Sequence, residues 1–176
     1  APKVSIGLPV YNGESYLEHA IRSIIEQTYQ DFELVISDNA STDCTRNICE
    51  KYASLDPRIR YFRSDTNNGL AWNWNRVLVL SQGDYFRWTA HDDLVNARFI
   101  AVAAEILDRD PGIVLCYSRE KFIDAHGRVV YKQESRLANV GSYLPEKRFR
   151  DMVLIDHWCL PIYGLIRSTV LKESAP

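Results

Sequence analysis

The feature that most constrains the fold is a regular alternation of strand-like and helix-like patterns with short connections. Short apolar runs alternate with segments whose apolar residues recur at i, i+3, i+4 and i+7. This alternation is typical of an α/β fold with a mostly parallel, doubly wound sheet and helices on both faces. The predicted strands are 4–10, 32–37, 59–62, 85–89 and 113–117, and the predicted helices are 17–25, 48–53, 71–81 and 96–107.

The tail from about residue 119 departs from this alternation and is less regular. Two short apolar runs flank Ala125-His126-Gly127, which is typical of a hairpin. The predicted elements of the tail are strands 122–124 and 129–131, an exposed loop at 133–145, and helices 148–155 and 168–173.

The composition is that of an ordinary soluble domain. The chain has 176 residues, 46% of them hydrophobic and 25% charged, which suffices for one domain with a sizeable core. The net charge of −2, with no basic stripe, argues against a nucleic-acid partner. No apolar run reaches membrane length and no signal peptide is recognisable. We therefore expect a cytoplasmic protein, or one held peripherally at the inner face of the membrane.

Two further expectations concern the state of the cysteines and whether the sequence is a fragment. Cys44, Cys49, Cys116 and Cys159 lack the spacing of zinc ligands, and we expect buried free thiols in a reducing compartment. Ala1 is not an initiator methionine, and Pro176 directly follows a helix-like run. We therefore expect a fragment of a longer protein.

Two adjacent carboxylates, Asp92 and Asp93, follow the aromatic strand-like run 85–89. Neighbouring acids at the end of a strand are hard oxygen ligands, suited to Mg²⁺ or Mn²⁺ shared with the phosphates of a substrate. The alternative is a pair of solvated acids at a helix N-terminus, where the helix dipole favours negative charge.

The loops expected at the carboxyl ends of the strands are polar and form the candidate ligand site. They lack both the glycine fingerprint for dinucleotides and the lysine-bearing P-loop, so a metal at the acid pair would have to balance phosphate charge. Tyr11 could stack on a base or lie in the core. Asp38 could accept hydrogen bonds from a base or ribose, or form a local turn.

Other residues in or near these loops could serve either the site or the fold. Asp43 is best placed to serve a helix N-terminus. His91 is expected to be exposed or to support the acids without binding metal itself. Trp72, Trp74 and Trp88 could line a sugar pocket or belong to the core.

Several motifs occur here in the order and spacing of the family 2 glycosyltransferases, which residues 3–110 resemble. These motifs are 4–12, 37–43, Asn68-Gly69 with Asn73 and Asn75, 83–85, and Asp92-Asp93. The resemblance implies the nucleotide-diphospho-sugar transferase fold called GT-A. It also implies transfer of a sugar from a nucleotide sugar, with UDP-sugars the leading donors, and inversion at the anomeric carbon.

The resemblance also implies roles for individual residues. Asp93 would be the main ligand of the Mn²⁺ or Mg²⁺ ion, with Asp92 on the ribose or the metal. The remaining implied nucleotide-binding residues are Pro9, Tyr11, Asn12, Glu14, Asp38, Asn39 and Asn68. The chain departs from many relatives at Asn39 and Ala90, where those relatives have acids.

The resemblance divides the chain into two parts of one domain. Residues 1–118 would bind the nucleotide sugar, and residues 119–176 would begin the half that binds a saccharide or lipid-linked acceptor of surface polysaccharide synthesis. The catalytic base would fall beyond Pro176, with Asp156 as a weak substitute.

The alternatives to a glycosyltransferase are a non-catalytic nucleotide-sugar-binding module and a sugar nucleotidyltransferase. The oligomeric state is not predicted.

Overall fold

The computed structural model describes residues 1–132, 141–155 and 160–174. The chain forms two compact units. The first comprises Ala1–Cys116 and Tyr163–Pro176, and the second comprises Tyr117–Ile162. The last segment of the chain thus returns to the first unit.

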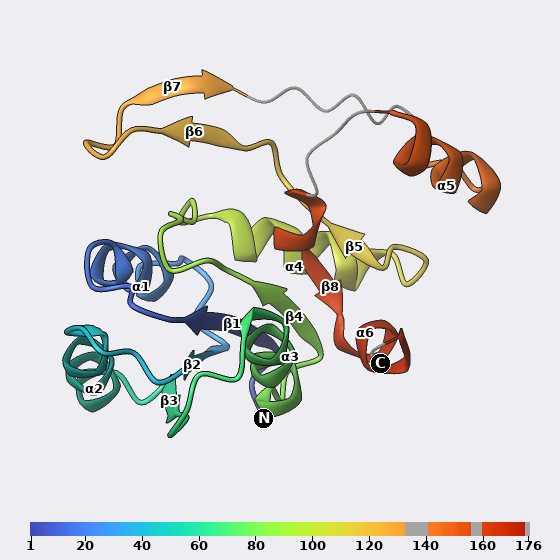
Figure 1. Cartoon of the computed structure of the whole chain (residues 1–176). Helices are drawn as coiled ribbons and strands as arrows, with labels where there is room; N and C mark the ends of the chain where they lie inside the picture. The colour runs from blue at the N-terminus through green and yellow to red at the C-terminus, as the bar shows by residue number, and fades with distance from the viewer. Residues whose placement is uncertain (133–140, 156–159, 175–176) are drawn as a thin grey trace. The chain divides into compact units, whose positions relative to one another are not determined.

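The first unit is built on a six-stranded sheet in the order β3-β2-β1-β4-β8-β5 (Figure 1). β2, β1 and β4 are parallel neighbours, β3 is parallel to β2, and β8 is antiparallel to both β4 and β5. The mostly parallel sheet is therefore confirmed. The strands are β1 Val4–Val10, β2 Phe32–Asp38, β3 Ile59–Arg63, β4 Tyr85–Trp88, β5 Leu115–Cys116 and β8 Leu165–Arg167.

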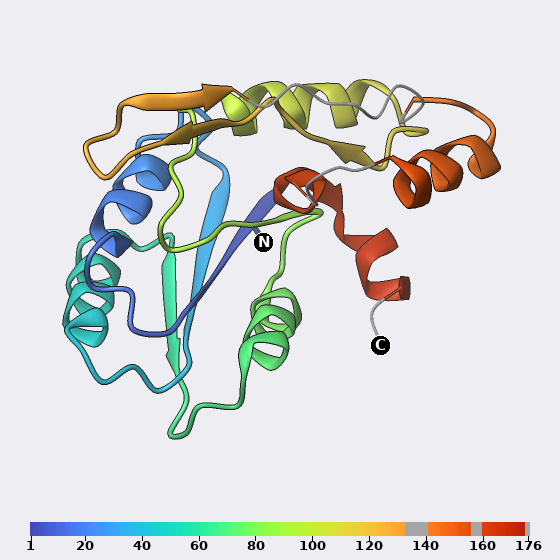
Figure 2. The same cartoon turned by 45° about the horizontal axis from the view of Figure 1, so that its top comes forward.

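Helices cover both faces of this sheet, as the alternation predicts (Figure 2). One core cluster joins α1, α2 and α4 to the sheet, and a second joins α3 and α6 to its other face. The second cluster is rich in aromatic residues, including Phe86 and Trp88. The helices are α1 Leu17–Ile25, α2 Thr45–Leu55, α3 Leu70–Leu80, α4 Phe99–Arg109 and α6 Ser168–Ser174.

β1 is the central strand of the parallel part, and all seven of its residues are buried. Its alternate residues Val4, Ile6, Leu8 and Val10 all belong to the first core cluster. Gly7 lies on the second face, where a Cβ atom would sit 2.7 Å from Cζ of Phe86 and 2.8 Å from Cγ2 of Val77. Close packing of α3 on the sheet therefore requires glycine at this position.

In the first unit, the structure departs from the sequence prediction at β8, β5 and α4. β8 was not predicted as a strand, because a three-residue strand carries no readable period. β5 has only two residues, where 113–117 were predicted. α4 begins at Phe99 rather than Asn96, because the Asn96 side chain accepts a hydrogen bond from the N–H of Arg98 in a turn before the helix (3.0 Å).

The second unit contains the predicted hairpin and helix. β6 Lys121–Ile123 pairs antiparallel with β7 Val129–Lys132, and Gly127 supplies a positive φ of 76° in the connection. Helix α5 Pro145–Leu154 begins three residues earlier than predicted, with proline at its first position. A short 3₁₀ helix, η1 Leu160–Tyr163, leads back to β8.

The described cysteines are free, but they differ in exposure. Cys49 is buried, Cys116 is partly buried and Cys44 is exposed. The prediction of a buried thiol is therefore wrong for Cys44. Cys159 lies outside the described residues. Across the part of the chain that the structure describes, no helix combines the length and apolar character needed to cross a membrane.

Gly83 is a sharp test of the packing between β1 and the turn before β4. A Cβ atom there would lie 2.7 Å from the backbone N of Ser5 and 2.8 Å from the carbonyl carbon of Val4. Because backbone atoms cannot move aside, Gly83→Ala should lower the free energy of unfolding in urea by about 1–3 kcal/mol. Gly141→Ala is the control, since nothing lies within 4 Å of its added Cβ atom. Equal stability of the two variants would contradict this packing.

Candidate functional site

The winding of the sheet reverses at β1. From β1 the chain proceeds through β2 to β3 on one side, and it then crosses to β4 on the other side. Ligands of open parallel sheets bind at the carboxyl ends of the strands beside such a reversal. The candidate site therefore consists of residues 11–14 after β1 and residues 89–93 after β4.

These two loops meet at Gly13. A Cβ atom on Gly13 would lie 2.8 Å from Cδ2 of His91 and 2.6 Å from Cγ2 of Val10. The His91 ring therefore packs against the loop after β1. This contact explains a histidine beside the acid pair without assigning it to a metal.

Asn12 connects the loop after β1 to the loop after β2. Its N–H donates to Oγ of Ser41 (2.9 Å), and its Oδ1 accepts from the N–H of Thr42 (2.8 Å). Asn12 has a positive φ of 52°, a conformation that asparagine tolerates better than most residues. The Asn12 side chain is thus used inside the protein, and its predicted nucleotide contact remains a prediction.

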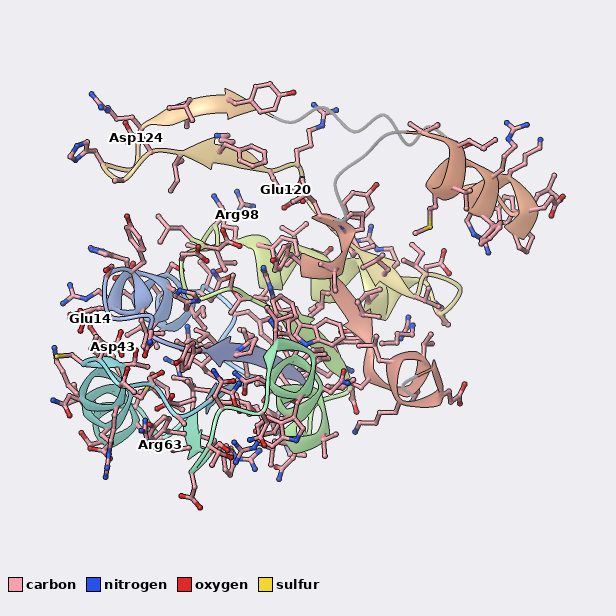
Figure 3. All side chains as sticks on the ribbon, viewed as in Figure 1. Glu14, Asp43, Arg63, Arg98, Glu120 and Asp124 are labelled. Atoms are coloured by element: carbon pink, nitrogen blue, oxygen red, sulfur yellow. The ribbon has the colours of Figure 1, made fainter. Side chains whose placement is uncertain are left out.

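Glu14 and Asp43 form a second connection between the same loops, and Figure 3 shows their side chains next to each other. The N–H of Glu14 donates to Oδ2 of Asp43 (3.0 Å), and the N–H of Cys44 donates to Oε2 of Glu14 (2.8 Å). Asp43 also accepts from the N–H of Thr45, the first residue of α2 (3.0 Å). Asp43 therefore serves the N-terminus of α2, as its position in the sequence indicated.

Asp38, the last residue of β2, is completely buried. Its Oδ1 accepts from the N–H of Ser41 (2.8 Å), and its Oδ2 accepts from the hydroxyl of Tyr61 (2.8 Å) and from Nη1 of Arg63. Burial raises the pKa of Tyr61, and the hydrogen bond to Asp38 raises it further. The Asp38 carboxylate thus binds three groups of the protein. A hydrogen bond to a nucleotide base would have to use a lone pair that these groups leave free.

Asn39 continues this internal network toward the loop before α3. Its Nδ2 donates to Oδ1 of Asn67 (2.8 Å) and to the carbonyl of Gly69 (3.1 Å), and its Oδ1 accepts from the N–H of Asn68 (3.0 Å). The side-chain amide of Asn68 donates to Oγ of Ser64 (2.8 Å). An aspartate at position 39 could not donate the first two hydrogen bonds, which explains asparagine here.

Asn73 joins three elements through one buried side chain. Its Oδ1 accepts from the hydroxyl of Ser37 (2.6 Å), and its Nδ2 donates to the carbonyls of Ser37 (3.0 Å) and Val10 (3.3 Å). The resemblance singled out Asn73 without giving it a role. The structure shows that it fixes α3 to the carboxyl ends of β1 and β2.

Tyr11 is free of this network. It is 45% exposed directly after β1, which excludes the alternative of a core tyrosine. Pro9 is buried within β1, opposite Ser37 of β2. Of these two residues only Tyr11 presents a side chain to solvent at the carboxyl edge.

Asp92 and Asp93 are solvent-exposed in the loop after β4. α4 begins at Phe99, well beyond the acids, and helix-dipole effects fade within the first turn. The reading as helix N-terminal acids is therefore wrong. The pKa of Asp93 is raised, first because nearby protein atoms displace water although the residue stays exposed, and then because of the charge of Asp92; Arg87 and His91 lower it.

The acid pair is a chemically suitable but incomplete donor set for a hard divalent cation. Two adjacent carboxylates supply oxygen ligands, and Mg²⁺ commonly adds waters and substrate phosphates to one or two carboxylates. Within the described ranges, no three or more His, Cys, Asp or Glu side chains gather in a way that could hold a metal. Asp92 and Asp93 therefore fit a metal that is shared with a phosphate ligand.

Two residues near the acids were missed from the sequence. Arg87 of β4 is buried, with its guanidinium carbon 4.7 Å from the ring centre of Phe99, and it lowers the pKa of Asp93. Tyr163, at the end of η1, is partly buried beside the second core cluster. For Arg87, the available signal in the sequence was a charged residue inside an otherwise aromatic strand. No periodic pattern in the sequence placed Tyr163 near the acids.

The three tryptophans separate into different environments. Trp88 is only 8% exposed and belongs to the second core cluster, while Trp74 packs against it partly buried. Trp72 is 40% exposed, with the guanidinium carbon of Arg76 4.9 Å from its ring centre. The core reading therefore holds for Trp88. Asp156, the weak candidate for the base, lies outside the described residues.

Comparison with known proteins gives consistent matches. Residues 5–166 match the family model described as glycosyl transferase family 2. The chain is 34% identical over 132 residues to the uncharacterized glycosyltransferase RT0329 of Rickettsia typhi, covering 74% of this chain and 40% of that protein.

Two solved structures share the fold. The crystal structure of S. aureus TarS 1–349 in complex with UDP-GlcNAc matches with a TM-score of 0.73 and 25% identity, over 97% of this chain and 47% of that one. The mannosyltransferase PcManGT from Pyrobaculum calidifontis, in complex with GDP-Man and Mn²⁺, matches with a TM-score of 0.59 and 29% identity, over 65% of this chain and 34% of that one. The chain thus spans less than half the length of these relatives.

The raised pKa of Asp93 predicts that its charge opposes folding. A carboxyl group whose pKa is higher in the folded state loses stability as pH rises from its unfolded pKa, about 3.9, through the folded value. Asp93→Asn should therefore raise the melting temperature slightly at pH 7, and the gain should vanish below about pH 4. Thermal unfolding at both pH values measures this, with exposed Asp65→Asn as control. A lower melting temperature for Asp93→Asn at pH 7 would show that the charge is stabilising.

Proposed function

The chain belongs to glycosyl transferase family 2, and we propose that it is the donor-binding part of a metal-dependent enzyme that transfers a sugar from a UDP-sugar. The observation that carries the proposal is the exposed Asp92–Asp93 pair at the carboxyl edge, beside the reversal at β1. The UDP-GlcNAc bound by TarS supports the choice of donor.

The acids and the cation have complementary roles. Without a cation, Asp92 and Asp93 would repel a diphosphate as like charges. A bound Mn²⁺ or Mg²⁺ would neutralise the phosphates and stabilise the leaving diphosphate. Asp93 would be the main protein ligand, with Asp92 on the metal or the ribose. The Mn²⁺ in the PcManGT complex supports this part of the proposal.

The base of the nucleotide would lie against the loop after β1. Tyr11 is an exposed aromatic residue directly after β1, and aromatic rings bind bases by stacking. The buried network of Asp38, Asn39 and Asn73 would hold the loop in place, so that Tyr11 is presented without further ordering. Pro9, Asn12, Glu14 and Asn68 would contribute through loop shape more than through direct contact.

The chemical step would be an in-line attack by an acceptor hydroxyl with inversion at the anomeric carbon. A general base would take the hydroxyl proton, a contribution that typically reaches about 10²–10⁴-fold. We place this base beyond Pro176, and the acceptor, a saccharide or lipid-linked saccharide, against residues C-terminal to the donor site. Slow hydrolysis of the donor by residues 1–176, with faster transfer by a C-terminally extended chain, is the expected pattern.

Metal dependence of nucleotide binding tests the role of the acid pair. UDP should bind at least about tenfold more tightly with Mn²⁺ than with EDTA, a difference of about 1.4 kcal/mol in isothermal titration calorimetry. Asp93→Asn should remove this difference, while Asp65→Asn should keep it. Equal UDP affinity of the unmodified protein in Mn²⁺ and in EDTA would exclude the metal role.

Substitution of Tyr11 tests the base pocket. Tyr11→Ala should weaken UDP binding by about 1–3 kcal/mol if the ring stacks on uracil. Tyr16→Ala is a matched control, because Tyr16 is also 45% exposed and lies in the same β1–α1 connection. If Tyr11→Ala binds UDP like the control but melts at a much lower temperature, Tyr11 is a structural residue and the pocket is misplaced.

A further inference from the structure

Tyr163 enters the first unit next to the acid pair through the antiparallel strand β8. β8 pairs with β4 so that Arg167 faces Tyr85 and Ile166 faces Phe86. Because the strands run in opposite directions, the residues just before β8 lie at the carboxyl end of β4, from which the acid loop leaves. A segment far away in the sequence thus supplies a side chain to the candidate site.

The Tyr163 ring is held by an aromatic stack. It packs edge-on against Trp74, with ring centres 6.0 Å apart and an interplanar angle of 62°. Trp74 is itself stacked on Trp88, at 6.3 Å and 28°, and its carbonyl accepts from Nε1 of Trp88 (2.9 Å). Trp88 is buried in the core, so the stack connects the Tyr163 ring to the core of the first unit.

The hydroxyl of Tyr163 is available to a ligand. It has no hydrogen bond to any residue in the described ranges, although the ring is partly buried. The pairing of β8 with β4 places Tyr163 at the end of β4 that leads to the acids, and the pKa of its phenol is raised by burial and then by the charges of Asp93 and Asp92. A phenol held by ring contacts can pack its ring against a sugar and exchange a hydrogen bond with a sugar hydroxyl.

We propose that Tyr163, supported by Trp74, forms the wall of the donor-sugar subsite and helps to determine which hexose the protein accepts. The inference rests on the proposed function, because it places the diphosphate at Asp92 and Asp93 and therefore the sugar next to them. Tyr163 would act on the sugar and not on the nucleotide. Its contribution is thus the difference between the affinities for a nucleotide sugar and for its nucleotide diphosphate.

Calorimetry with Mn²⁺ measures this difference, using UDP and UDP-GlcNAc as probes, together with UDP-glucose and the pair GDP and GDP-mannose. For the sugar nucleotide that binds best, Tyr163→Phe should weaken binding by about two- to tenfold, the effect of one lost hydrogen bond. Tyr163→Ala should weaken it further. In both variants the affinity for the nucleotide diphosphate should stay within about twofold of the original value.

Tyr85→Phe is the matched control, because it removes a phenol at the opposite end of β4 that donates to Asp108 (2.6 Å). It should change neither affinity. Saturation-transfer NMR gives a second readout on the unmodified protein: irradiation of aromatic protons should reach the ring protons of the donor sugar.

Three results would overturn the inference. The first is an unchanged sugar-nucleotide affinity in both Tyr163 variants, and the second is an absence of saturation transfer to the sugar. The third is a sugar nucleotide that binds the unmodified protein no more tightly than its diphosphate, which leaves the proposed function standing but removes the subsite. Failure to bind any nucleotide would instead contradict the proposed function, and the inference would fall with it.

Discussion

The carboxyl edge of the sheet depends on the buried carboxylate of Asp38. This group receives hydrogen bonds from the backbone after β2, from Tyr61 and from Arg63 of β3. A buried charge is tolerated only where partners replace the lost water, so the chain around it has little freedom to rearrange. Asn39 and Asn73 extend the constraint to the loop before α3 and to the end of β1. The end of β1, from which the loop with Tyr11 leaves, is therefore held by hydrogen bonds within the protein.

This arrangement separates two kinds of polar residue. The side chains of Asn12, Glu14 and Asn39 form hydrogen bonds that connect the loops to one another. Tyr11, Asp92 and Asp93 are exposed at the same edge. The pKa of Asp93 is raised first by the loss of surrounding water and then by repulsion from the charge of Asp92. Strain in a charged pair that a cation would relieve is characteristic of binding sites, because structural ion pairs are normally arranged to attract.

The sequence was most informative where many residues share one period. The first two strands and the helices that cover the parallel part were predicted because these elements extend over seven to eleven residues, long enough to show a period. β8 could not be predicted, since three residues carry no period and its place in the sheet depends on antiparallel pairing with distant β4.

The residues of the candidate site also differ in how far the sequence could predict their roles. The positions of Tyr11 and of the acid pair were readable from the ends of strands, but the internal use of Asn12 and Asn39 depends on contacts between loops. Tyr163 depends on a return of the chain that local sequence does not encode.

The central claim is that a metal and a nucleotide diphosphate bind together at the carboxyl edge between β1 and β4. Paramagnetic relaxation in NMR tests it directly, because Mn²⁺ broadens only the signals of nearby amides. With UDP and a small amount of Mn²⁺, the amides of residues 11–13 and 90–93 should broaden strongly, while those of residues 82–84 at the opposite edge should not. The same titration with Mg²⁺ is the diamagnetic control. Broadening centred on residues 82–84, or equal broadening without UDP over the whole surface, would contradict the account.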